Sequence, residues 1–318
     1  MPQQKNKLKV VYQNRPKNSW LGGDYIQLEK TVEAIKEFDI ETEINEQPIY
    51  LPAENYKKFD LVHLWNFSMK WTKVQMGVAR MWAKPIVCSM IYHESDMFVP
   101  YNIQQIMLDS TDACIFLTPS EVDRVKRHLK IDDKKIHIIP NGVDKFWFNK
   151  VPRSKDYVLT VGRVEPHKGQ LEVAKACKQL KLKYVMVGED TDKEYLQKCI
   201  EAGAEWVGKK TGYELLKLYA GCSVFILASR AEVMPLVVME AGCQAKNIVV
   251  AEHCEWKDIP NAEWCKYGVV SSIKKAILKS LAKDDNIELR DKLKKMTWDK
   301  VAKQIKKVYE SVIMDKTK

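Results

Sequence analysis

The sequence alternates short apolar segments with segments of helical period, and this alternation occurs twice. In the first half, the apolar segments have the length of buried strands and cover residues 8–13, 60–65, 85–92 and 113–118. In the second half, segments of the same kind cover residues 157–162, 183–189, 223–229 and 247–252. Helical patterns such as 27–38 and 169–180 fall between them. Buried strands that alternate with helices predict parallel sheets with helices on both faces.

The two series are separated by VPRSKD at residues 151–156, a polar segment that contains a proline. A chain of 318 residues is also longer than a single hydrophobic core usually is. We therefore predict an α/β protein with two doubly wound, Rossmann-like domains, residues 1–150 and residues 151–296. Such domains bind ligands at the carboxyl ends of their strands, so we expect a binding cleft between them.

Cysteine usage and hydrophobicity predict a cytoplasmic protein. The eight cysteines are scattered and include no Cys-x-x-Cys pair, which favours reduced thiols over disulfides or a zinc site. No apolar run approaches the roughly 20 residues that are needed to span a bilayer. The first residues, MPQQKNKLKVVYQ, lack the longer apolar core of a secretory signal.

The net charge of +10 is concentrated near the C-terminus. Residues 1–150 carry 21 Lys and Arg against 19 Asp and Glu, a net +2, whereas residues 274–318 carry 14 against 7, a net +7. We favour a solvated helix face as the explanation. The alternative is attachment to an anionic membrane, which would make the protein peripheral at that membrane. Nucleic-acid binding is not expected, because basic and aromatic residues do not interleave there.

Two carboxylates enclose an apolar segment in ASRAEVMPLVVMEAG, residues 228–242. Glu232 follows a strand that ends at Ser229, and Pro235 is typical of the first turn of a helix. Glu240 then lies in the second turn, near the same end of the strand. Such a pair could accept hydrogen bonds from sugar hydroxyls. Alternatively, each acid could cap a helix or pair with a nearby base.

The segment VGRVEPHKGQ, residues 161–170, follows the first strand of the second domain and opens its first helix. A helix N-terminus favours phosphate because its backbone N–H groups are free. Arg163 and Lys168 add two cations there, and Gly162 and Gly169 allow close approach of the backbone. A diphosphate site beside hydroxyl acceptors predicts a nucleotide diphosphate that bears a sugar.

Seven segments in order make essentially the whole chain resemble the retaining glycosyltransferases of family 4, which have the two-Rossmann GT-B fold. They are GGDYIQLEKTVEAI, IYHESD, STDACIFLTPSEVDRV, IHIIPNGVDKFWF, GRVEPHKG, SRAEVMPLVVMEAG and TWDKVAKQIKKVYESV. The last segment is similar to the family's closing helix. The resemblance therefore implies that residues 297–318 return to the N-terminal domain.

The resemblance also implies a role for each matching residue. Arg163 and Lys168 would bind the donor diphosphate, Glu240 would bind the ribose, and Glu232 would contact the donor sugar. His93 would lie near the reacting carbon, so His93 and Glu232 are the expected catalytic residues. Further expected donor contacts are Gly22, Gly23, Gly162, Met234, Pro235 and Leu236. No metal or cofactor is implied, since the two cations and the helix dipole do the work of a divalent ion.

At two places the sequence differs from the pattern of the family, so the identity of the donor sugar is not predicted. The family usually has Gly-Phe-Gly where this chain has Val233-Met234-Pro235, and Gly-x-Pro where it has Ala245-Lys246-Asn247. Two assignments also have structural alternatives. His93 could be a buried histidine bonded to a backbone carbonyl, and Gly22 with Gly23 could form an ordinary turn.

The expected activity is transfer of a sugar, with retention of its anomeric configuration, from a nucleotide-diphosphate sugar such as a UDP- or GDP-sugar. The acceptor would be a hydroxyl group of a glycan, a lipid-linked molecule or another compound. Two alternatives remain from the sequence. One is a nucleotide-sugar epimerase of the same fold, and the other is a non-catalytic nucleotide-sugar-binding protein.

Overall fold

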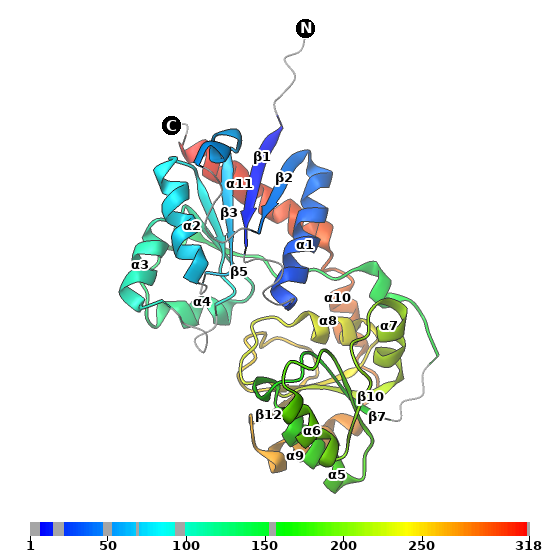
Figure 1. Ribbon diagram of the computed structural model, residues 1–318. Coiled ribbons are helices and arrows are strands. Elements are labelled where there is room, and N and C mark those ends of the chain that lie inside the picture. The colour runs from blue at the N-terminus through cyan, green and yellow to red at the C-terminus, as the bar shows by residue number, and fades with distance from the viewer. Residues whose placement is uncertain are drawn as a thin grey trace. The chain divides into compact units, whose positions relative to one another are not determined.

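The structure is a computed structural model that describes residues 7–14, 22–46, 53–67, 70–92, 99–152 and 157–316. The chain divides into two units (Figure 1). The first unit combines Met1–Gly142 with Trp298–Lys318, and the second is Val143–Thr297.

The first unit is built on a parallel sheet with the spatial order β2-β1-β3-β4-β5-β6. Its strands are β1 (Leu8–Gln13), β2 (Ile40–Asn45), β3 (Leu61–Trp65), β4 (Ile86–Ser89), β5 (Ala113–Phe116) and β6 (Ile136–Ile138). Every residue of β3, β4 and β5 is buried. This is the pattern expected of central strands that are covered on both faces.

The helices of the first unit are α1 (Gly23–Ile35), α2 (Lys70–Met81), α3 (Tyr101–Asp109), α4 (Pro119–Lys126) and α11 (Trp298–Lys316). Successive side chains of a strand point to opposite faces of the sheet. Val11, Val62 and Cys88 share a core with apolar residues of α2, α3 and α4. Tyr12 and His63 contact α11, which packs against α1. Helices therefore cover both faces.

Buried hydrogen bonds join α11 to the sheet of the first unit. The Tyr309 hydroxyl lies 2.8 Å from the Tyr12 hydroxyl and 2.6 Å from Nδ1 of His63. His63 Nε2 lies 2.9 Å from Oγ of Ser89. Burial lowers the pKa of His63 to about 3, so its imidazole is neutral at pH 7. The last helix of the chain thus completes the interior of the first unit.

The second unit repeats the arrangement with the parallel order β12-β11-β10-β7-β8-β9. Its strands are β7 (Tyr157–Val161), β8 (Tyr184–Val187), β9 (Ala204–Trp206), β10 (Cys222–Leu227), β11 (Asn247–Ala251) and β12 (Glu263–Cys265). Its helices are α5 (Gln170–Leu180), α6 (Lys193–Glu201), α7 (Gly212–Gly221), α8 (Leu236–Cys243), α9 (Val270–Leu281) and α10 (Ile287–Leu293). The α/β class with two doubly wound sheets is confirmed.

The second unit begins at Val143, earlier than the boundary that the sequence suggested at residue 151. The Val143 N–H donates to the Met296 carbonyl at 2.8 Å, and Val143 pairs with Thr297 in a short parallel bridge. Gln244, the residue just after α8, donates its side-chain amide to the carbonyls of Trp147 and Asn149. These bonds attach the segment before the polar linker to the second unit.

All eight cysteines are buried and free. Within the described ranges, no group of three or more His, Cys, Asp or Glu side chains is arranged to hold a metal ion. None of the helices in the described part of the chain is both long and apolar enough to cross a membrane.

Candidate functional site

The loop after β7 carries the predicted cations and leads into α5. A single 3-10 turn, Pro166–Lys168, precedes Gly169, whose φ of 68° lies in the left-handed region. A methyl group on Gly169 would lie 2.4 Å from the carbonyl oxygen of Ala228, the residue just after β10. The loop after β7 therefore lies directly against the end of β10, and only glycine permits this approach.

The loop after β8 also lies directly against the loop after β7. A methyl group on Gly188 would lie 1.9 Å from the Gly162 carbonyl oxygen, and the Val164 N–H donates to the Glu189 carbonyl at 2.9 Å. Gly188 is not among the residues predicted from sequence. Its contact joins two loops that are distant in sequence, so a single-sequence pattern gives no signal for it.

The loop after β10 places Glu232 beside the loop after β7. The Arg230 N–H donates to the His167 carbonyl at 2.8 Å, and Glu232 pairs with Cys254 in a short bridge. Helix α8 then begins at Leu236, with Pro235 as the residue just before it and not within its first turn. Pro235 and Met234 are buried, whereas Leu236 is partly exposed. Glu240 lies in the second turn of α8, as predicted.

Each predicted cation of the loop after β7 lies against a carboxylate. Lys168 Nζ is 2.7 Å from Oε1 of Glu232, and the two side chains are only 17% and 15% exposed. An Arg163 guanidinium nitrogen is 3.0 Å from Oε1 of Glu165. The structure thus pairs Lys168 with Glu232 close to Gly162, and it pairs Arg163 with Glu165 in the same loop.

Glu240 is held by a tyrosine and has an unusual acidity. The buried Tyr219 hydroxyl, from α7, donates to Oε2 of Glu240 at 2.7 Å. Burial raises the pKa of Glu240 to about 7, and the negative charge of Asp144 raises it further, while the Tyr219 hydrogen bond opposes the shift. Tyr219 and Asp144 were not singled out from sequence, because neither is near Glu240 along the chain.

Lys246 explains one of the departures from the family pattern. Ala245 adopts a left-handed φ of 57°, a position at which a family glycine would be unstrained. The buried Lys246 Nζ donates to the carbonyls of Ala220 at 2.6 Å and Cys222 at 3.0 Å, at the junction between α7 and β10. The departure thus supports the backbone behind Tyr219 and leaves Glu240 in place.

The other expected site residues belong to the first unit. Gly22 is the residue before α1, and its carbonyl accepts the N–H groups of Tyr25 at 3.1 Å and Ile26 at 3.3 Å. A methyl group on Gly23 would meet no described atom within 4 Å, so packing does not explain the glycine there. His93 lies outside the described residues.

A buried acid that the sequence analysis missed holds the chain just before His93. Ile91 has a φ of 44°, a rare conformation for a β-branched residue. The following residue, Tyr92, donates its N–H to Oε1 of Glu121 at 2.8 Å, while Leu117 donates to Oε2 at 2.7 Å. Burial raises the pKa of Glu121 to about 7 against the opposing effect of these bonds. The Thr-x-x-Glu spacing of a capping box was the available signal.

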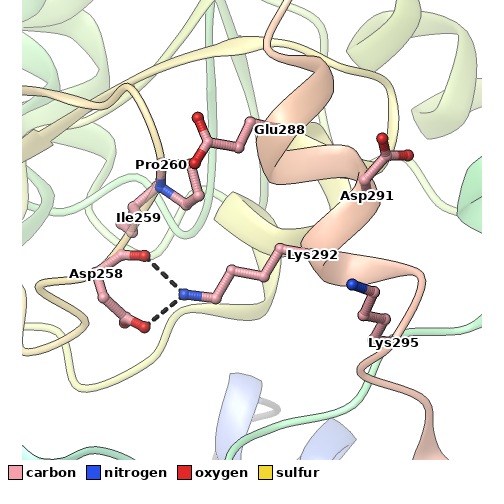
Figure 2. Close-up of a pocket in the computed structure, with 7 residues that line it drawn as sticks. All are labelled: Asp258, Ile259, Pro260, Glu288, Asp291, Lys292 and Lys295. Atoms are coloured by element: carbon pink, nitrogen blue, oxygen red, sulfur yellow. Dashed lines mark hydrogen bonds and ion pairs between the residues drawn. The ribbon is translucent and has the colours of Figure 1, made fainter.

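An open pocket of about 610 Å³ lies elsewhere on the second unit, between the segment 258–260 and α10 (Figure 2). Its charged side chains include both signs, and Lys292 donates to the carbonyl and the carboxylate of Asp258. None of the residues that line it is among those predicted to bind the donor.

Comparison with known families gives two adjoining matches. The profile described as "Glycosyl transferases group 1" matches residues 144–300, and "Glycosyltransferase Family 4" matches residues 48–145. Together they extend over most of the chain, from the first unit to the start of α11.

Two curated proteins are similar over a limited segment. One is N,N'-diacetylbacillosaminyl-diphospho-undecaprenol alpha-1,3-N-acetylgalactosaminyltransferase of Campylobacter jejuni, 30% identical over 125 residues, which are 38% of this chain and 32% of that protein. The other is sulfoquinovosyl transferase SQD2 of Arabidopsis thaliana, 30% identical over 125 residues, 35% of this chain and 24% of that protein. The match thus spans a third or less of each relative.

Solved structures are similar over the whole chain. Anabaena HepE in complex with UDP has a TM-score of 0.76 at 14% identity, covering 96% of this chain and 100% of HepE. Sucrose-phosphate synthase from Thermosynechococcus elongatus has a TM-score of 0.80 at 14% identity, covering 97% of this chain and 100% of that one. At these identities the likeness establishes the fold.

Proposed function

The chain belongs to the group 1 glycosyltransferases of family 4, and from that premise we propose that it is a retaining, hexosyltransferase-type enzyme. The donor would be a nucleotide-diphosphate sugar, and the acceptor a hydroxyl group of a glycan or a lipid-linked molecule. The observation that carries the proposal is the Lys168–Glu232 ion pair, which joins the loops at the carboxyl ends of β7 and β10, with the Arg163–Glu165 pair in the first of these loops. Ligands bind at these ends in doubly wound folds.

Binding of the donor would exchange the partners of these two ion pairs. The diphosphate would take the Arg163 guanidinium from Glu165 and the Lys168 ammonium from Glu232. Glu232 would then accept hydrogen bonds from the donor sugar. Both cations would also stabilise the negative charge that grows on the diphosphate as the bond to the sugar breaks. We propose that these cations perform the task that a divalent metal performs in other enzymes.

Glu240 would accept the ribose hydroxyls with the oxygen that Tyr219 does not engage. His93 would act on the sugar from the first unit, and Gly22 and Gly23 would bring backbone close to the donor or acceptor. The remaining contacts would come from Gly162, Met234, Pro235 and Leu236.

A lipid-linked acceptor is supported by the name of the Campylobacter jejuni relative, which contains diphospho-undecaprenol. Such an acceptor would lie in a membrane, so the protein would work in the cytoplasm at or near an anionic bilayer. UDP is a reasonable first nucleotide to test, because HepE was solved with UDP and with UDP-glucose.

The test is a thermal-shift panel of UDP, GDP, ADP and their sugars, followed by product analysis with the stabilising sugar. A ligand at 100 times its Kd adds roughly 2.7 kcal/mol to the stability of the binding unit. Glu232→Gln should retain binding of the free nucleotide but lose turnover, whereas Glu240→Gln should weaken both. If no nucleotide stabilises the protein, the proposal fails.

The same panel separates the alternatives. An epimerase would change the donor sugar when no acceptor is present. A non-catalytic binding protein would be stabilised by the nucleotide sugar and would release no nucleotide diphosphate with any acceptor.

A further inference from the structure

A small pocket on the second unit is lined by none of the predicted donor contacts. It has a volume of about 230 Å³ and is formed by Asn149, Lys150, Val151, Gln244 and Arg290. We call these five residues the Arg290 pocket. The volume falls below the range of about 300–1,000 Å³ that is usual for pockets that hold drug-sized ligands. The pocket therefore has room for a small ion or for one end of a larger molecule.

The lining of the Arg290 pocket is positively charged. It includes the side chains of Lys150 and Arg290 and no carboxylate. Lys150 is exposed and Arg290 is partly buried, and among the described residues neither forms an ion pair with an acid. Other lysines of the second unit are neutralised, for example Lys283 by Glu263 at 2.6 Å. The two cations of the pocket are therefore available to an anion.

The Arg290 guanidinium is fixed beside the chain segment that forms the other wall of the pocket. Its Nη2 donates to the Phe148 carbonyl at 3.4 Å. The same segment is held by Gln244, which donates its side-chain amide to the carbonyls of Trp147 and Asn149. In the described part of the chain, Nε of Arg290 is buried and has no hydrogen-bond partner. A buried N–H group of a charged side chain is costly to leave unpaired, so this group favours a ligand that supplies an acceptor.

The larger pocket beside α10, shown in Figure 2, has a different charge. Three of its side chains are carboxylates, Asp258, Glu288 and Asp291, and two are lysines. Lys292 is already bonded to Asp258, as the dashed lines in Figure 2 show. An anion in that pocket would meet three acids, whereas in the Arg290 pocket it meets none. The Arg290 pocket is therefore the better anion site of the two.

We propose that the Arg290 pocket binds an oxyanion of the phosphate type, either free phosphate or the phosphate group of a larger molecule. The Arg290 guanidinium donates from Nε to a phosphate oxygen, and the Lys150 ammonium supplies a second positive charge. The pocket shares no residue with the diphosphate loop, residues 161–170. The proposal is therefore independent of the proposed function.

The test is a titration of the full chain with inorganic phosphate, followed through backbone amide signals in NMR spectra. Sodium chloride at the same ionic strength is the control. The amides of Lys150 and Val151 report on the Arg290 pocket, and those of Gly162 and Gly169 report on the diphosphate loop, which phosphate can also enter. We expect the Lys150 and Val151 signals to shift to saturation with phosphate and to stay in place with chloride. Equal shifts with both salts would overturn the proposal.

Variants identify the groups that bind the anion. Arg290→Gln should weaken phosphate binding, read at the Val151 amide, by about tenfold or more, because it removes a charge-assisted hydrogen bond. Lys150→Ser should weaken it severalfold. The matched control, Lys145→Ser, removes the same charge from an exposed position outside the pocket and should bind as the wild type does. Because Arg290 also bonds to the Phe148 carbonyl, Lys150→Ser is the deciding variant if Arg290→Gln does not fold. A phosphate affinity in Lys150→Ser that equals that of Lys145→Ser would overturn the proposal.

The diphosphate loop has its own variant. Lys168→Ala should reduce the response of Gly162 and Gly169 to phosphate and leave that of Val151 unchanged. If Lys168→Ala also abolishes the response of Val151, the phosphate binds in the diphosphate loop and the Arg290 pocket is not an anion site.

Glycerol phosphate, titrated in the same way, distinguishes the two sources of the anion. Tighter binding than that of inorganic phosphate, read at Val151, would identify the occupant as the phosphate end of a larger molecule. Equal or weaker binding would identify it as free phosphate. If neither compound shifts the Lys150 and Val151 signals, the proposal is wrong, and the proposed function stands or falls separately on nucleotide binding.

Discussion

Arg163 and Lys168 each have a carboxylate partner, and this pairing decides how substitutions at the site should behave. Replacing either cation by Ala should weaken binding of a nucleotide diphosphate by about 1.5–3 kcal/mol, the usual range for a charge-assisted hydrogen bond. Glu165→Gln should strengthen binding, because it removes the acid that lies 3.0 Å from Arg163. Titration calorimetry measures both effects. Unchanged affinity in the two Ala variants would remove the diphosphate from this loop.

Glu240 should make donor binding depend on pH near neutrality. Its pKa of about 7 means that it gains a proton as the pH falls below that value. Because the ionised form accepts hydroxyl hydrogen bonds better, affinity for a nucleotide-diphosphate sugar should rise between about pH 6 and pH 8. A sugar-bearing diphosphate is the ligand to use, since it has no terminal phosphate that titrates in this range.

Two variants assign this pH dependence. Asp144→Asn removes a charge that raises the pKa of Glu240, so the rise in affinity should move to lower pH. Glu240→Gln should bind more weakly than the wild type above about pH 7 and show no rise. The same pH profile in Glu240→Gln as in the wild type would assign the titration to another group.

At the scale of elements, Glu121 joins the ends of β4 and β5 to the start of α4. Its two oxygens accept backbone N–H groups from Tyr92 and Leu117, and the Glu121 N–H donates to Oγ1 of Thr118 at 3.1 Å. Glu121→Gln replaces one acceptor by an N–H₂ group, which leaves a buried N–H without its partner. The local cost should be about 1–3 kcal/mol.

Hydrogen exchange measures this cost at the two amides. Exchange at Tyr92 and Leu117 should accelerate in Glu121→Gln and stay unchanged in Asp123→Asn, an exposed neighbour on α4. If the Tyr92 and Leu117 amides are equally protected from exchange in Glu121→Gln and Asp123→Asn, Glu121 does not hold these two amides. The pKa of Glu121 is raised from 4.5 to about 7, so the native state binds a proton that the unfolded state does not. Its contribution to stability is therefore present below pH 4.5 and is lost as the pH rises through 7.

The elements that sequence predicted are those with a continuous apolar pattern. The segment 247–252 was predicted as a strand and contains β11. All five residues of β11 are buried, which accounts for its continuous apolar pattern. Strand β2, by contrast, has only Ile40 and Asn45 buried, since it lies at the edge of the sheet and its polar side chains face water. Strands β6, β9 and β12 are three residues long and were likewise not predicted.

In the candidate site, too, some residues could be predicted from sequence and others could not. Glu232, Glu240, Arg163 and Lys168 could be identified because each stands in a local motif beside a strand end. Their partners could not, because Tyr219 meets Glu240 only after α7 and α8 have packed together. A pKa near 7 depends on that packing, so composition and spacing carry no sign of it.

At the scale of the whole molecule, loss of the Tyr309 hydroxyl should lower the stability of the first unit and leave that of the second unit unchanged. Tyr309→Phe removes the hydroxyl that contacts both Tyr12 and His63, at a cost of about 1–3 kcal/mol for the buried groups left behind. Amides of β1 and β3 should exchange faster, while those of β7 and β10 serve as the internal control. If amide exchange in Tyr309→Phe accelerates equally in both units, the effect of Tyr309 is not confined to the first unit.

His63 gives the first unit a dependence on acid as well. Its pKa falls from 6.5 to about 3 on burial, so the unfolded chain binds a proton that the native state does not. The neutral imidazole therefore supports the first unit fully above about pH 6.5, and this support is lost progressively as the pH falls towards 3.

Helix α11 also affects how the protein is made. The ribosome completes the whole second unit, Val143–Thr297, before it adds the first residue of α11. At about 5–20 residues per second this delay is on the order of ten seconds. During that time Tyr12 and His63 lack the helix that contacts them, so the nascent chain leaves this part of its first sheet without α11. We therefore expect the half of the protein that is translated first to be the last to finish folding.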